Sequence, residues 1–186
     1  MGGNIACIFA GVRPGRVGRL VNLEGLGMRD SRAEDAPRRY AKWLDDLAKP
    51  QQFRGYASYE DLARRLCESN GRLDPERARF LAQHWGIQRD DGRIDLRSDP
   101  AHKRVNPVLY RGTEIAACLR SITAPVTWVE GELSDAFTKY KMFREEVNER
   151  RRQIPNCVQK TIEGAGHMMH HDRPESVAEV LSDFFA

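Results

Sequence analysis

Residues 162–174 read Ile-Glu-Gly-Ala-Gly-His-Met-Met-His-His-Asp-Arg-Pro, and the rest of the chain is best interpreted from this stretch outward. It predicts the end of a strand, a loop bracketed by Gly164 and Gly166, and a helix that opens at Pro174. The loop presents His167, and histidine suits general acid/base chemistry because it changes charge near neutral pH. A surface histidine without a function fits the same loop, so the remaining sequence has to decide between the two interpretations.

The size and charge of the chain restrict its function class. Its 186 residues are enough for one domain, or for one domain with a small insertion. The formal net charge is only +3 and both signs are interspersed, which argues against a nucleic-acid partner or a membrane-binding surface. No apolar run approaches the roughly 18 residues of a membrane-spanning helix, and no signal peptide opens the sequence.

The cysteines and histidines indicate a reduced, cytoplasmic protein without a metal centre. Four cysteines are scattered along the chain with no C-x-x-C pair, at positions 7, 67, 118 and 157. His167, His170 and His171 lie close together, but no second cluster with metal-ligand spacing accompanies them. We therefore expect no metal site.

Apolar periodicity predicts an α/β fold at both ends of the chain. Residues 4–10 are expected to form a helix in which Ile5, Ile8 and Phe9 share a face. Strands are expected at residues 17–24, 124–131 and 157–162, the last of them near a sheet edge because its apolar residues alternate with polar ones. The final helix carries a core-facing stripe of Val177, Val180, Leu181, Phe184 and Phe185.

The middle of the chain has a different character. It is rich in charged residues and predicts several short helices, with a capping box at Ser58 and a helix start at Asp74-Pro75. It shows no alternation of strands and helices, apart from a small hairpin that turns at Asp91-Gly92. We therefore predict a helical insertion at residues 30–122 between two core segments, residues 1–29 and 123–186.

Three of the expected loops carry candidate catalytic residues. Glu24, Asp135 and His167 each follow one of the predicted strands, and parallel sheets place their sites at the carboxyl ends of such strands. Asp135 follows one predicted strand and His167 the next, which makes them candidate partners at this edge of the sheet. Glu24 is the alternative acid, whereas Glu132 is expected to be solvated.

These motifs together resemble the C-terminal half of the α/β-hydrolase family. The resemblance rests on the strand at residues 125–131 followed by Ser134-Asp135, on Gly164-Ala165-Gly166-His167, and on the amphipathic last helix. Met1-Gly2-Gly3-Asn4 looks like the tail of the family's nucleophile elbow, G-x-S-x-G-G. The insertion looks like a cap domain, as in bacterial hydrolases related to esterases, epoxide hydrolases and haloalkane dehalogenases.

The resemblance implies a set of roles and a small-molecule substrate. His167 would act as base and then as acid, and Asp135, or alternatively Glu24, would orient its imidazole. The backbone N–H of Met1 would donate to the oxyanion, and the family chemistry needs no cofactor. The substrate and the bond cleaved stay open, because cap pockets decide them.

The sequence departs from the family at one decisive point. The nucleophile would lie directly before Met1, and no serine or cysteine of this chain stands in G-x-S-x-G. We therefore expect a hydrolase fragment that is inactive alone, with an open sheet edge that favours self-association. Two alternatives remain: one half of a split hydrolase whose partner supplies the N-terminal half, and a non-catalytic binding protein that keeps the cap.

Overall fold

A computed structural model of the protein describes residues 1–49, 52–53 and 55–186. The chain divides into two compact units. The core unit comprises Met1–Asp30 and Tyr110–Ala186, and the insertion unit comprises Ser31–Leu109. The insertion thus ends at residue 109 and not at residue 122 as the sequence suggested, because the helix at Gly112–Arg120 packs against the N-terminal helix of the core unit.

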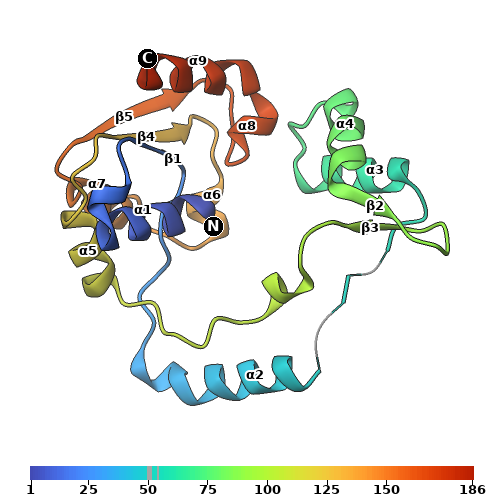
Figure 1. Cartoon of the computed structure of the whole chain (residues 1–186), viewed down its shortest axis with the longest axis horizontal. Coiled ribbons are helices and arrows are strands. Elements are labelled where there is room, and N and C mark those ends of the chain that lie inside the picture. Colours follow the sequence, from blue (N-terminus) through green and yellow to red (C-terminus); the bar gives the residue numbers. More distant parts are fainter. Residues whose placement is uncertain (50–51, 54) are drawn as a thin grey trace. The chain divides into compact units, whose positions relative to one another are not determined.

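The core unit is built on three parallel strands, which confirms the predicted α/β class (Figure 1). Their order is β1 (Leu20–Leu23), β4 (Val126–Gly131) and β5 (Cys157–Ile162). Every residue of the central strand β4 is buried, whereas β5 lies at an edge of the sheet, as predicted, and half of its residues are exposed. The register pairs Leu23 with Val129 and Gly131 with Ile162, so all three strands end at the same side of the sheet.

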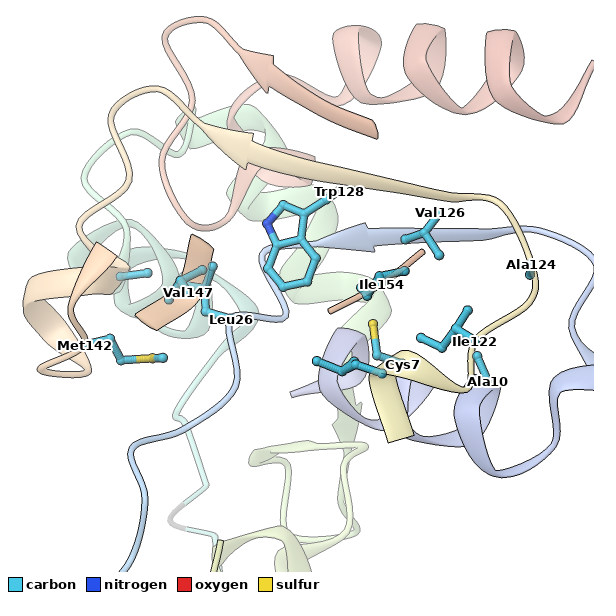
Figure 2. Close-up of a cluster of buried hydrophobic side chains, with 12 residues drawn as sticks. Cys7, Ala10, Leu26, Ile122, Ala124, Val126, Trp128, Met142, Val147 and Ile154 are labelled. Atoms are coloured by element: carbon cyan, nitrogen blue, oxygen red, sulfur yellow. The ribbon is translucent and has the colours of Figure 1, made fainter. Parts of the chain in front are cut away.

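Helices cover both faces of this sheet. Val126 and Trp128 point into a cluster with residues of α1, α5 and α7 (Figure 2), while Val129 packs on the other face with residues of α8 and α9. The helices of the core unit are α1 (Gly2–Val12), α5 (Gly112–Arg120), α6 (Ala136–Lys139), α7 (Arg144–Arg152), α8 (Met169–Asp172) and α9 (Pro174–Phe185), with a 3₁₀ turn η1 (Pro14–Arg16). The core unit therefore has three layers, as α/β sheets require.

Helix α1 forms where it was predicted but buries a different face. The sequence pattern grouped Ile5 with Phe9, and both are exposed, at 60% and 47%. The buried face carries Cys7 and Ala10 instead. It lies so close to α5 that a Cβ added at Gly11 would stand 2.0 Å from the carbonyl oxygen of Cys118, so only small residues fit there.

The insertion unit has its own apolar core between α3, α4 and a small hairpin. Ser58 caps α3 by accepting a hydrogen bond from the Asp61 amide at 3.1 Å, and Asp74 caps α4, as the sequence predicts. Its elements are η2 (Ala33–Asp35), α2 (Ala36–Ala48), α3 (Tyr59–Ser69), α4 (Pro75–Trp85), β2 (Gly86–Gln88), β3 (Ile94–Leu96) and η3 (Pro100–Lys103). Among the described residues of both units, no helix has the length and apolar character needed to cross a bilayer.

Candidate functional site

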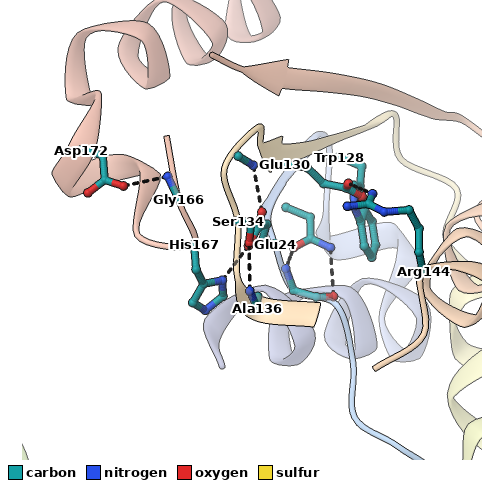
Figure 3. Close-up of polar contacts among 12 residues, drawn as sticks. Glu24, Trp128, Glu130, Ser134, Ala136, Arg144, Gly166, His167 and Asp172 are labelled. Carbon is teal, nitrogen blue, oxygen red and sulfur yellow. Dashed lines mark hydrogen bonds and ion pairs between the residues drawn. The ribbon is translucent and has the colours of Figure 1, made fainter. Parts of the chain in front are cut away.

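The carboxyl ends of the three core strands bring together Glu24, Ser134 and His167 (Figure 3). Glu24 directly follows β1, Ser134 lies in the loop after β4, and His167 lies in the loop after β5. The three residues come from distant parts of the sequence, and the parallel sheet makes them neighbours because its strands end together.

Glu24 is held in an uncommon backbone conformation. Its φ angle is +46°, in the left-handed region that non-glycine residues seldom adopt. Its amide still donates to the carbonyl of Val129 at 3.0 Å, so strand pairing extends up to this residue. The chain then turns sharply, because the side-chain oxygen of Asn22 accepts a hydrogen bond from the Gly25 amide at 2.6 Å. The left-handed residue thus turns the chain at the end of the strand and leaves the Glu24 carboxyl group buried between the strand ends.

The Glu24 side chain is fully buried and its carboxylate contacts three donors. Oε1 accepts a hydrogen bond from the Gly131 amide at 2.8 Å. Oε2 accepts one from the Ser134 hydroxyl at 2.7 Å and lies 2.7 Å from Nδ1 of His167. Because hydrogen bonds to a carboxylate stabilise its charged form, these donors offset the cost of burying the charge.

The two ring nitrogens of His167, Nδ1 and Nε2, have different surroundings. Its Nδ1 faces Glu24, and 22% of its side chain is exposed. The Tyr140 ring meets the imidazole edge-on, with the ring centroids 5.6 Å apart. Within the described part of the chain, Nε2 of His167 makes no hydrogen bond. A carboxylate on Nδ1 fixes the proton there, so Nε2 is the nitrogen available to take a proton from another group.

The loop that carries His167 is held by the loop after β4. Gly131 has no room for a side chain, since an added Cβ would stand 2.5 Å from the carbonyl oxygens of both Ala165 and Gly166. The Leu133 amide donates to the Ala165 carbonyl at 2.9 Å. Glu132, which we expected to be solvated, is exposed but accepts a hydrogen bond from the Gly164 amide at 2.9 Å. The β4 loop therefore positions both partners of the Glu24–His167 contact.

The structure corrects the expected pairing of His167 with Asp135. Asp135 is exposed, and its side chain forms no hydrogen bond or ion pair with any residue that the structure describes. The chain turns tightly after β4, where the Ser134 amide donates to the Gly131 carbonyl at 3.1 Å. That turn directs Ser134 toward Glu24 and leaves Asp135 exposed, directly before α6. The carboxylate beside the imidazole is that of the alternative acid, Glu24.

Met1 precedes the first turn of α1, and its carbonyl accepts hydrogen bonds from the amides of Asn4 and Ile5. That turn packs directly against the loop after Glu24: a Cβ added at Gly3 would stand 2.9 Å from the Cα of Gly25. The start of α1 thus lies beside the candidate site, while the role of the Met1 N–H stays a prediction.

His171, in α8, is buried, whereas the neighbouring His170 is exposed. Burial lowers the pKa of His171 to about 4, with a smaller effect in the same direction from His170. Asp172 is also buried and accepts a hydrogen bond from the Gly166 amide at 2.8 Å, which ties the His167 loop to α8. Within the described residues, no group of three or more histidines, cysteines or carboxylates is arranged to hold a metal ion.

Sequence reasoning missed Ser134 and Gly131 as members of the site. The sequence predicts a polar loop after β4, but its pattern favours the carboxylate of Asp135 over the neighbouring hydroxyl of Ser134. The signal that could have identified both residues is their position at the end of a strand rich in apolar residues, where a glycine permits close backbone approach.

Comparisons with known proteins identify the fold. No protein-family model and no curated protein sequence matches the chain. The solved structure of a thioesterase domain from the curacin biosynthetic pathway is similar, with 22% identity, a TM-score of 0.79, and coverage of 97% of this chain and 63% of that one. A Mycobacterium tuberculosis esterase is 19% identical with a TM-score of 0.69, covering 98% of this chain and 59% of that one.

An α/β hydrolase from Novosphingobium aromaticivorans is 21% identical with a TM-score of 0.61, covering 97% of this chain and 61% of that one. The chain therefore spans less than two thirds of the length of these structures. At such identities the likeness concerns the fold, and the chain has the fold of the C-terminal part of an α/β-hydrolase.

Proposed function

We propose that this chain, with its α/β-hydrolase fold, carries the acid–histidine pair of a hydrolase that cleaves an ester, a thioester or a related bond of a small molecule. In this proposal His167 is the general base and then the general acid, and Glu24 is the acid that orients it. The observation that carries the proposal is the 2.7 Å contact between His167 Nδ1 and the buried carboxylate of Glu24.

The geometry supports this assignment of roles. A buried carboxylate on Nδ1 holds the imidazole in one orientation and one tautomer, and it stabilises the imidazolium that forms when Nε2 takes a proton. Partial exposure of the ring lets Nε2 face a substrate. The proposed chemistry uses no metal or cofactor, because the charges that develop are met by side chains and backbone amides.

The nucleophile is proposed to lie outside the pair. Ser134 is unsuited to that role because its hydroxyl is bonded to Glu24, on the acid's side of the imidazole. We propose a serine or aspartate directly before Met1, at the turn into α1, with the Met1 N–H as an oxyanion donor. The close contact between Gly3 and Gly25 supports this position, because it brings the start of α1 beside the loop of the orienting acid.

The remaining family assignments are also proposals. The insertion unit is proposed as the cap that selects the substrate. The esterase and thioesterase names of similar structures favour an acyl substrate. The proposed acid, Glu24 after the first core strand, is compatible with an ester and with a thioester. Because loss of the nucleophile lowers turnover on the order of 10⁶-fold in a serine protease, we expect the 186-residue chain to be nearly inactive alone.

A split hydrolase is a second candidate, and one observation favours it. Within the described residues, the outer edge of β1 pairs with no strand, and Ile5 and Phe9 of α1 are exposed. A partner chain that supplies the N-terminal half would cover this edge and bring the nucleophile with it.

The first experiment is the intact mass of the protein from its native source, set against the 21.2 kDa of this sequence. A larger protein would be assayed with p-nitrophenyl butyrate and an acyl thioester; a protein of 21.2 kDa would be assayed together with the partner with which it co-purifies. We expect hydrolysis that His167→Ala abolishes. Turnover that survives His167→Ala, or no turnover by either form, would overturn the proposal, and the second result would favour a non-catalytic binding protein.

A further inference from the structure

We infer that Ser134 is a positioning residue that shares one carboxylate oxygen of Glu24 with His167 and thereby sets the strength of the Glu24–His167 hydrogen bond. The inference rests on the proposed function, in which these two residues act as a pair. The observation behind it is that Ser134 Oγ and His167 Nδ1 each lie 2.7 Å from the same atom, Oε2 of Glu24.

The hydroxyl proton of Ser134 has one suitable direction. Ser134 Oγ accepts a hydrogen bond from the Ala136 amide at 3.2 Å, which uses one of its lone pairs. The buried carboxylate oxygen offers no proton when ionised, so the Ser134 hydroxyl must be the donor in their contact. The start of α6 thus orders the serine, and the serine donates to the acid.

Ser134 also completes the fixation of the carboxylate. The Gly131 amide holds Oε1 and the Ser134 hydroxyl holds Oε2, and both donors belong to the loop after β4. Two donors on different oxygens prevent rotation of the carboxylate plane.

Sharing of Oε2 has a chemical consequence. A hydroxyl that donates to a carboxylate oxygen draws negative charge from it, so the same oxygen accepts less strongly from the His167 N–H. Without the Ser134 hydroxyl, Glu24 stays anchored through Gly131 and buried, and its bond with His167 should become stronger. A serine with a merely structural role would leave that bond unchanged or, by loosening the loop, weaken it.

The test measures that bond directly. In the 186-residue chain labelled with ¹⁵N-histidine, the low-field Nδ1–H resonance of His167 is identified by its loss in His167→Gln. We expect Ser134→Ala to move it downfield and Ser134→Thr, which keeps a hydroxyl, to restore it. All spectra are taken at one pH, so that a change in the charge of the nearby His170 does not contribute.

Two further variants distinguish an error in the inference about Ser134 from an error in the proposed Glu24–His167 pair. Glu24→Gln should move the resonance upfield or remove it, which tests the pair itself. Ser121→Ala is the matched control, since this hydroxyl bonds to the Ala117 carbonyl elsewhere in the core unit. An unchanged or upfield resonance in Ser134→Ala, with a normal response to Glu24→Gln, would overturn the inference alone. No response to Glu24→Gln would overturn the pair and the inference with it.

Ser134→Cys provides a second test in case Ser134→Ala does not fold. The thiol is a weaker donor, so a downfield shift smaller than that of Ser134→Ala supports the inference, and the wild-type position or an upfield shift contradicts it. Circular dichroism of each variant establishes that the core unit is folded before its spectrum is compared.

Discussion

Gly131 and Ala165 touch backbone to backbone at the place where β4 ends and the His167 loop passes. A Cβ on Gly131 would stand 2.5 Å from the carbonyl oxygen of Ala165, a distance that real side chains do not tolerate. The loop after β4 already provides both donors that fix Glu24. This one contact therefore links Glu24 to the loop that carries His167.

Gly131→Ala should destabilise the core unit by about 1–3 kcal/mol, because the added methyl group forces the two loops apart. The free energy of unfolding in urea is the measurement. Gly18→Ala is the matched control, since a Cβ there meets nothing within 4 Å, and we expect it to change stability by less than about 1 kcal/mol. Equal unfolding midpoints for the two variants would contradict this account of Gly131.

Glu24→Gln and Asp135→Asn should separate the two candidate acids in the active form of the proposed hydrolase. If Glu24 orients His167, Glu24→Gln lowers kcat on the order of 10³–10⁴-fold, as loss of the orienting acid does in a serine protease. Exposed Asp135 makes no contact with His167 in the described structure, so Asp135→Asn should keep nearly full activity. If Asp135→Asn lowered kcat more than Glu24→Gln did, Asp135 would be the acid that orients His167.

His171 should make the protein less stable in mild acid. Burial lowers its pKa to about 4 from an ordinary value of 6.5, and His170 adds to this while Asp172 opposes it. Between pH 6.5 and 4 the unfolded chain then binds a proton that the folded chain does not, so the free energy of unfolding falls as the pH falls. The effect is at most on the order of 3 kcal/mol.

Urea unfolding at pH 7 and pH 5 measures this loss of stability. We expect His171→Gln to reduce the difference between the two pH values, whatever its effect on stability at pH 7. Exposed His102 is the control, and His102→Gln should leave the difference unchanged. A difference that His171→Gln does not alter would mean that other groups cause the acid sensitivity.

Cys7 should be the least reactive thiol of the folded protein. It is 3% exposed, and burial raises its pKa to about 12, with a further contribution from Cys157. Because the thiolate is the reactive form, iodoacetamide at pH 8 should modify Cys7 more slowly than the half-buried Cys67. Mass spectrometry of the labelled peptides gives both rates, and labelling in urea should remove the difference. Equal rates in the native state would contradict the burial of Cys7.

The exposed face of α1 should cause self-association of the isolated chain. Ile5, Phe9 and Val12 are exposed on one stripe of the helix, and one edge of β1 is unpaired in the described structure. Sedimentation velocity at tens of micromolar should detect oligomers that Phe9→Glu shifts toward monomer. Val108→Glu, at another exposed apolar position, in the insertion unit, should have little effect. A wild-type chain that stays monomeric at these concentrations would contradict this prediction.

The order of the elements could be predicted from the sequence because it depends on local patterns. The strand at residues 157–162 shows its edge position in its alternation, and Ser58 and Asp74 mark helix starts because their side chains cap the amides that follow. His167 was recognised for a similar reason, since a histidine between two glycines at a strand end needs no distant partner to be noticed. The parallel arrangement of the three strands follows from the helices between them.

Only the tertiary structure decided which carboxylate meets the imidazole and which face of α1 is buried. Both acids follow a strand in the sequence, but the register of β1 on β4 and the tight turn after Gly131 aim Glu24 and Ser134 inward and leave Asp135 outside. The apolar stripe of α1 is visible in the sequence, yet a helix buries the face that its neighbours can approach most closely, and here that is the face of Gly11. Local periodicity determines that an element forms, whereas close approach between distant backbones determines what it touches.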